Sequence, residues 1–191
     1  MRVRDALKRY NETFADVAPT EEKHAWRSTK ASLSAPSSMA AKQALAPVRY
    51  RVPEPEKKKV IFVCVGNACR SQMAEAFAIR YGSDILDVAS AGITPASALP
   101  DLTKAVMMDR GISLDGHFSK GTEVFQKMQW DLVVNMSGRQ LASLQGTRTV
   151  DWRIADPMGQ RQVVHERVRD EIENLVMRLI LEFRTEARRQ S

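Results

Sequence analysis

One short stretch of the sequence holds residues that together could bind and attack a tetrahedral anion. It reads Cys64-Val65-Gly66-Asn67-Ala68-Cys69-Arg70-Ser71, with an arginine six residues after a cysteine. The run over residues 60–65 is apolar and β-branched, which predicts a strand buried on both faces. A helical pattern begins directly after the stretch. The sequence therefore predicts a loop that leads into a helix N-terminus, where backbone N–H groups bind anions.

Each residue type in this loop has a use in such chemistry. The planar guanidinium of Arg70 can hold two anion oxygens at once. The positive field at the loop would favour the thiolate form of Cys64, which is the nucleophile. A thiolate beneath a bound phosphate is placed for in-line attack on phosphorus. Ser71 could donate a hydrogen bond to that sulfur, and Gly66 and Asn67 tolerate unusual backbone angles.

A nucleophile of this kind needs a partner that protonates the leaving oxygen. Asp156 is the candidate, 92 residues after Cys64 and in the only Asp-Pro pair of the chain. As a neutral acid it would protonate the leaving group, and as a carboxylate it would then activate water. Two alternatives remain: Asp156-Pro157 only makes a turn, or Asp151, in or beside a strand, is the acid.

The other cysteine and the histidines have simpler interpretations. Cys69 is either a packed loop residue or a redox partner that forms a reversible disulfide with Cys64. We interpret His117 as a surface or loop histidine and His165 as structural or solvent-facing. The spacing of the cysteines and histidines does not suit a zinc site, so we expect no metal and no cofactor.

Strand and helix patterns alternate along the chain after residue 59. The predicted strands are residues 60–65, 86–89, 131–136 and 148–154, and the predicted helices are residues 71–82, 101–110, 140–144 and 164–183. This alternation predicts an α/β domain with a mainly parallel sheet. Ligands of such sheets bind beyond the carboxyl ends of the strands, which again indicates the loop after Val65.

The first third of the chain has a different composition. Residues 1–59 hold 13 basic and 7 acidic side chains, whereas residues 60–191 hold 16 of each. Residues 2–17 carry an apolar stripe at helical spacing. Residues 25–53 hold no acidic residue and are rich in Ala, Ser and Pro, which predicts disorder. We therefore divide the chain into a basic, largely flexible extension, residues 1–58, and a catalytic domain, residues 59–191.

Composition also bears on partners and location. The excess of basic charge is confined to the extension, so a nucleic-acid partner is not expected. No run approaches the roughly 18 apolar residues of a membrane-spanning helix, so no membrane partner is expected either. Two cysteines cannot form a disulfide framework. A cytoplasmic location is predicted.

The loop, followed by Gln72-Met73-Ala74-Glu75, resembles the signature loop of low-molecular-weight protein tyrosine phosphatases and their relatives, the arsenate reductases. Ser90-Ala91-Gly92 and Asp156-Pro157 fit the same family in the same order, over residues 59 to about 185. The resemblance implies a doubly wound four-stranded parallel sheet with helices on both faces. It also implies a phosphocysteine mechanism.

By this resemblance Cys64 is the nucleophile, Arg70 clamps the phosphate, and Asn67 and Ser90 hold the loop in shape. The loop residues that would surround the substrate are Val65, Gly66, Asn67, Ala68, Cys69 and Ser71. Asp156 takes the role of the acid.

Departures from the family patterns bear on the activity. Tyrosine phosphatases of this family usually have aromatic residues after Asp-Pro, where this chain has Met158-Gly159, and a proline where it has Gln72. The thioredoxin-coupled arsenate reductases need two further cysteines. Here Ser137 stands where the first is expected, and no cysteine follows.

We therefore predict a phosphomonoester hydrolase of the protein tyrosine phosphatase type, acting on a phosphorylated protein or a small phosphomonoester. One alternative is an arsenate reductase that uses an external thiol reductant. The other is a non-catalytic oxyanion-binding module.

Overall fold

The computed structural model describes residue 5 and residues 56–190. Apart from residue 5, the predicted helix over residues 2–17 and the predicted linker over residues 25–53 lie outside the described residues. Among the described residues, no helix has a stretch that is both long and apolar enough to cross a membrane.

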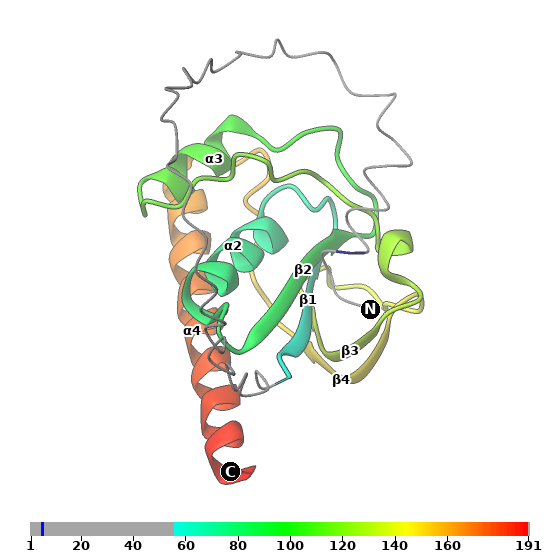
Figure 1. Ribbon diagram of the computed structural model, residues 1–191. Helices are drawn as coiled ribbons and strands as arrows, with labels where there is room; N and C mark the ends of the chain where they lie inside the picture. Colours follow the sequence, from blue (N-terminus) through cyan, green and yellow to red (C-terminus); the bar gives the residue numbers. More distant parts are fainter. Residues whose placement is uncertain (1–4, 6–55, 191) are drawn as a thin grey trace, which may run out of the picture.

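Four parallel strands form one sheet in the order β2-β1-β3-β4 (Figure 1). The strands are β1 (Lys58–Cys64), β2 (Leu86–Gly92), β3 (Gln129–Asn135) and β4 (Gln145–Asp151). Because β1 lies inside the sheet and its last five residues are buried, its apolar run is unbroken. Cys64 pairs with Gly92, and Asn135 pairs with Asp151, so the carboxyl ends of all four strands lie along one edge.

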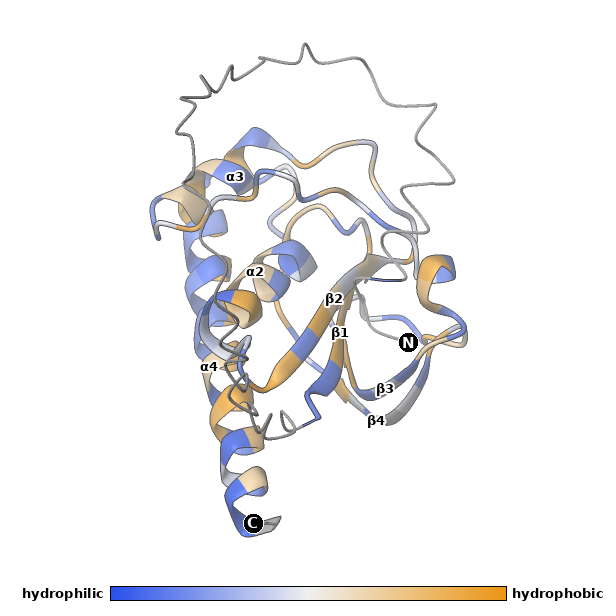
Figure 2. Ribbon diagram, in the orientation of Figure 1, coloured by the Kyte–Doolittle hydropathy of each residue, from blue (hydrophilic) through white to orange (hydrophobic). Residues whose placement is uncertain are grey.

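Three α-helices cover one face of this sheet. They are α2 (Arg70–Gly82), α3 (Asp101–Met108) and α4 (Gln162–Gln190). The apolar side chains of these helices form one hydrophobic cluster with Val60, Phe62, Leu132 and Val134 of the strands. Figure 2 shows α4 with both apolar and hydrophilic segments, the pattern of a helix with one buried side.

The second face of the sheet is covered by one short 3-10 helix and loops. This helix, η2 (Thr122–Phe125), buries Phe125 edge-on against Trp130, with ring centroids 5.7 Å apart. The predicted doubly wound α/β fold, with a four-stranded parallel sheet and helices on both faces, is therefore confirmed. The sequence pattern had given no sign of η2.

The connection between β3 and β4 differs from the prediction. We predicted a short helix over residues 140–144, but bends at residues 137–139 and a turn at residues 142–143 lie there instead, and β4 begins at Gln145 rather than at residue 148. The side chain of Asn135 explains the difference. Its Oδ1 accepts from Ser137 N (3.0 Å) and its Nδ2 donates to Arg139 O (2.9 Å), which bends the chain as it leaves β3.

The close packing of Gly92 under the loop at residues 65–69 leads to the first prediction. A Cβ on Gly92 would lie 2.8 Å from Asn67 N and 2.9 Å from Val65 O, both backbone atoms that no rotamer change can move. Gly92→Ala should therefore push the loop away and lower the free energy of unfolding by about 1–3 kcal/mol. Urea denaturation measures this change.

Gly66→Ala is the matched control, because its Cβ would meet its nearest neighbour at 3.9 Å, an ordinary contact. Equal stability of the two variants would contradict the packing described for Gly92.

Candidate active site

Three successive carbonyl groups of the loop between β1 and α2 face the same segment of the chain. The carbonyl oxygens of Cys64, Val65 and Gly66 accept hydrogen bonds from the backbone N–H groups of the segment 93–96, at 2.9–3.2 Å. In a planar peptide the N–H points opposite to the C=O. The N–H groups that follow these carbonyls therefore point away from that segment. Successive amides with this orientation form a nest that can bind an anion.

Asn67 sits at the centre of the loop with a φ of 47°, a left-handed conformation that asparagine tolerates better than most residues. Its side chain is fully buried and fully bonded. Nδ2 donates to Ser71 Oγ and to Ser90 Oγ, each at 2.8 Å, and Oδ1 accepts from Lys120 N at 2.7 Å. This network ties the loop to α2, to β2 and to the segment that precedes η2.

The cysteine at the end of β1 faces the first turn of α2. Cys64 Sγ lies 3.0 Å from Ser71 Oγ, and both side chains are buried. Because Ser71 Oγ already accepts from Asn67 Nδ2, its own proton is free to bond the sulfur. A hydroxyl donor at this position stabilises a thiolate and would stabilise a departing sulfur.

Arg70 is buried, and most of its donors are occupied. Nη1 donates to Met136 O (2.9 Å) and Ile154 O (3.2 Å), which fixes the guanidinium between the ends of β3 and β4. Nη2 is bonded to Asp156 Oδ2. Nε is buried and has no hydrogen-bond partner among the described residues. A buried donor without a partner is costly, so this Nε is suited to an anion that binds in the loop.

Asp156 and Asp151, the two candidate acids, have different contacts. Asp156 pairs with Arg70 through one oxygen, and its other oxygen accepts from Met158 N at 3.2 Å, so the predicted turn is present as well. Asp151 instead accepts from Asn135 Nδ2 at 2.8 Å. Asp156 is therefore the carboxylate of the two that pairs with Arg70.

Cys69 is directed toward α3. Its Sγ lies 3.1 Å from Thr103 Oγ1, and both residues are buried. Burial raises the pKa of the Cys69 thiol, and the Thr103 hydrogen bond only partly offsets this effect. Both cysteines are free thiols. No three His, Cys, Asp or Glu side chains within the described residues lie together in a way that could hold a metal ion.

A second layer of residues supports the loop, and it joins α2 to residues 117–120. Gln72 Nε2 donates to Asn67 O (3.0 Å), Asn67 Oδ1 (3.0 Å) and Phe118 O (2.8 Å). The amide oxygen of Gln72 therefore faces His117 Nδ1, at 2.8 Å. Because an amide oxygen only accepts, His117 carries its proton on Nδ1. His117 is a loop histidine, as predicted, but it is bonded to α2 rather than open to solvent.

An ion pair completes this layer. Glu75 Oε2 accepts from Ser90 Oγ at 2.6 Å and from Lys120 Nζ at 3.4 Å, and all three side chains are buried. Since Ser90 is also bonded to Asn67, the carboxylate fixes the orientation of the loop asparagine through the serine. Gln72 and Glu75 lie in the motif that follows the loop, but His117 and Lys120 are 42 to 48 residues further along, so no local pattern could have grouped all four.

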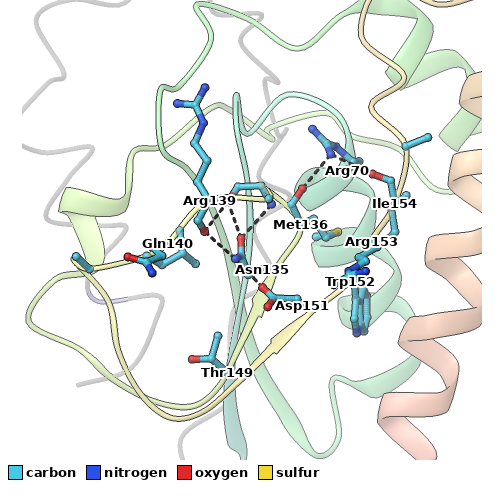
Figure 3. Close-up of a pocket in the computed structure, with 15 residues that line it drawn as sticks. Arg70, Asn135, Met136, Arg139, Gln140, Thr149, Asp151, Trp152, Arg153 and Ile154 are labelled. Carbon is cyan, nitrogen blue, oxygen red and sulfur yellow. Dashed lines mark hydrogen bonds between the residues drawn. The ribbon is translucent and has the colours of Figure 1, made fainter.

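A pocket of about 1020 Å³ opens beside Arg70 (Figure 3). Its walls are the β3–β4 connection and the residues that follow β4: Arg70, residues 135–142, Thr149 and residues 151–155. The pocket therefore adjoins the anion site through the guanidinium that both share.

A family model described as low molecular weight phosphotyrosine protein phosphatase matches residues 59–190. The chain belongs to this family. The match covers the whole sheet and all the site residues described above, so the predicted family is confirmed.

The known proteins that are similar to this chain in sequence include several arsenate reductases. It is 35% identical to a glutaredoxin arsenate reductase from Synechocystis sp. over 130 residues, which are 64% of this chain and 98% of the relative. It is 38% identical to arsenate reductase 1 from Bacillus cereus over 122 residues, 61% of this chain and 89% of the relative.

Solved structures similar to this chain include an arsenate reductase and a phosphatase. An arsenate reductase in its phosphate-binding state superposes with a TM-score of 0.58 at 32% identity, over 66% of this chain and 98% of that chain. An arginine phosphatase from Geobacillus stearothermophilus superposes with a TM-score of 0.59 at 27% identity, over 70% of this chain and 97% of that chain. Relatives with both kinds of activity thus share the fold.

The burial of His117 leads to a pH prediction. Burial lowers the pKa of His117 below its usual value; Lys120 adds to this effect and Glu75 opposes it. The unfolded chain takes up a proton near pH 6.5, before the folded state does. The free energy of unfolding should therefore fall as the pH drops below about 6.5, and level off below the lowered pKa.

His117→Asn keeps a donor near the position of Nδ1 but cannot titrate, so its stability should fall less between pH 8 and pH 5.5. Urea denaturation at both pH values measures the difference, and His165 is common to both proteins. Parallel losses of stability would show that His117 does not titrate in this way.

Proposed function

We propose that the chain is a phosphomonoester hydrolase that acts through a phosphocysteine, with phosphotyrosine as its natural class of substrate. The observation that carries this proposal is the bonding of Arg70. Arg70 binds Asp156 through Nη2, while its buried Nε has no partner among the described residues. The next residue of α2, Ser71, contacts Cys64. Nucleophile, clamp and acid thus meet at one edge of the sheet.

In the first step Cys64 attacks phosphorus, and an S–P bond forms as the P–O bond breaks. The three equatorial oxygens gain charge in the transition state. They are bound by Arg70 and by the backbone N–H groups of residues 65–69 and 71. Asp156 gives its proton to the leaving oxygen. In the second step Asp156 takes a proton from water, the water attacks phosphorus, and the S–P bond breaks.

These roles predict a split between two substrates. Cys64→Ser should lower the turnover of any phosphomonoester by roughly 10³-fold or more. Asp156→Asn should lower the turnover of phenyl phosphate by about 10²–10⁴-fold, because a poor leaving group needs the proton. p-Nitrophenyl phosphate, with its better leaving group, should lose much less. Steady-state kinetics with both substrates measures the split.

Asp151→Asn is the control for the acid, since its carboxylate is bonded to Asn135 rather than to Arg70. Unchanged turnover in Cys64→Ser would overturn the proposed nucleophile. An equal loss on both substrates in Asp156→Asn would remove Asp156 as the acid. Phosphate binding by a wild-type protein without turnover would favour a non-catalytic oxyanion-binding module.

A second candidate function, arsenate reduction, is favoured by the relatives named arsenate reductases at 35–38% identity. Arsenate resembles phosphate in shape and charge, so the same nest would bind it. Reduction to arsenite needs two electrons, and the β3–β4 connection holds no cysteine to supply them. Ser137, at the end of β3, hydrogen-bonds Asn135 Oδ1 at 2.6 Å. The electrons would therefore come from two external thiols, which leave as a disulfide.

This second candidate is tested with arsenate and glutathione. Wild type should consume two equivalents of thiol for each arsenite formed, and Cys64→Ser should form none. Cys69→Ser should retain the rate within a few-fold, because the thiol of Cys69 bonds Thr103 and is kept protonated by burial. Arsenite formation that depends on Cys69 would contradict reduction by external thiols alone.

Three further predictions remain proposals. Cys69 is proposed as the partner of Cys64 in a reversible disulfide, for which it would have to turn away from Thr103. The division of the chain into an extension, residues 1–58, and a catalytic domain is proposed on composition. A cytoplasmic setting is proposed because two cysteines cannot form a disulfide framework.

A further inference from the structure

The pocket beside Arg70 is larger than the binding of a small phosphomonoester requires. Its volume of about 1020 Å³ lies at the upper end of the ~300–1,000 Å³ typical of small-molecule sites. The phosphate itself is bound by the loop and Arg70, outside most of this space. The pocket is therefore large enough for several residues of a polypeptide next to a phosphorylated side chain.

The charge of the pocket is mostly positive. Its lining holds Arg70, Arg139 and Arg153 against the single carboxylate of Asp151. Arg139 and Arg153 are exposed, and no described residue forms an ion pair with either guanidinium. Asp151 accepts a hydrogen bond from Asn135 Nδ2. In Figure 3 the side chain of Arg139 extends along one wall, while Arg70 lies across the pocket from it.

The walls of the pocket are already ordered. Asn135 is buried and bonds Ser137, Arg139 and Asp151, so it connects the β3–β4 connection to the end of β4. Apolar lining is supplied by Met136, Leu141 and Trp152, and Trp152 packs on Phe62 with ring centroids 5.8 Å apart. A site that is ordered before binding loses less entropy when a ligand enters.

We propose that this pocket binds the acidic residues that flank the phosphorylated side chain of a polypeptide substrate, through Arg139 and Arg153. The inference rests on the proposed phosphatase activity and narrows its substrate class to acidic phosphopeptides. Arg70 links the two sites, since it clamps the phosphate and lines the pocket.

The test uses three phosphotyrosine peptides of equal length whose flanking residues are Glu, Gln or Lys. The kcat/KM of wild type should decrease in the order Glu, Gln, Lys. Each arginine should contribute about 2- to 5-fold, as expected for pairs of exposed charges. The preference should shrink as salt rises from 50 to 500 mM, because exposed charges are screened.

The decisive variant is Arg139→Glu/Arg153→Glu, which should abolish or reverse the preference while p-nitrophenyl phosphate turnover stays within about twofold. Arg178→Glu is the matched control, since Arg178 is an exposed arginine of α4 outside the pocket, and it should keep the preference. Equal kcat/KM for the three peptides in wild type, or an unchanged preference in the double variant, would overturn the inference.

Peptide binding to Cys64→Ser, measured by fluorescence anisotropy, separates this inference from the proposed function. Charge-dependent binding without turnover of any phosphomonoester by wild type would leave the pocket assignment standing and remove the hydrolase. Turnover without any charge preference in binding would leave the hydrolase standing and overturn the pocket assignment. Competition by glutathione, with no discrimination among the peptides, would assign the pocket to a small thiol and overturn the inference.

Discussion

The left-handed backbone of Asn67 is the constraint on which the site depends. At a φ of 47° it reverses the chain between β1 and α2, and its buried side chain makes four hydrogen bonds that hold it there, one of them from Gln72. A residue in this conformation persists only where its surroundings over-determine it. Here those surroundings are Ser71, Ser90 and Lys120, and behind them Glu75. The geometry of the loop is thus set by buried side chains around it rather than by its own backbone alone.

The electrostatics of the site are local. Residues 60–191 hold equal numbers of acidic and basic side chains, so no net surface charge draws an anion to the loop. The field comes instead from the oriented amides of the loop, the N-terminus of α2 and the single guanidinium of Arg70. Such fixed dipoles need no reorganisation when charge develops in a transition state.

The loop between β1 and α2 could be predicted from sequence because its residues are contiguous. Cys64, Arg70 and Ser71 follow a buried strand and open a helix, and each position has a physical reason that can be read locally. The hydrogen bond between Gln72 and His117 joins residues 45 apart in sequence, so the spacing of apolar and polar residues cannot predict it. The helix predicted at residues 140–144 is absent, and the side chain of Asn135 bends the backbone just before it, at residues 137–139, through local hydrogen bonds that compete with helix formation.

The connection from β2 to β3 touches the loop twice. It leaves β2 through residues 93–96, which bond the loop carbonyls, and it returns through residues 117–120, which bond Asn67 and Gln72. Both ends of the intervening stretch are therefore fixed to the same rigid body. The free energy of closing a loop grows only with the logarithm of its length, by about 0.6 kcal/mol per doubling. Within this stretch α3 packs in the core and its Thr103 contacts Cys69. Insertions that leave the loop unchanged can therefore accumulate during evolution at the exposed turns, residues 109–111 and 115–116.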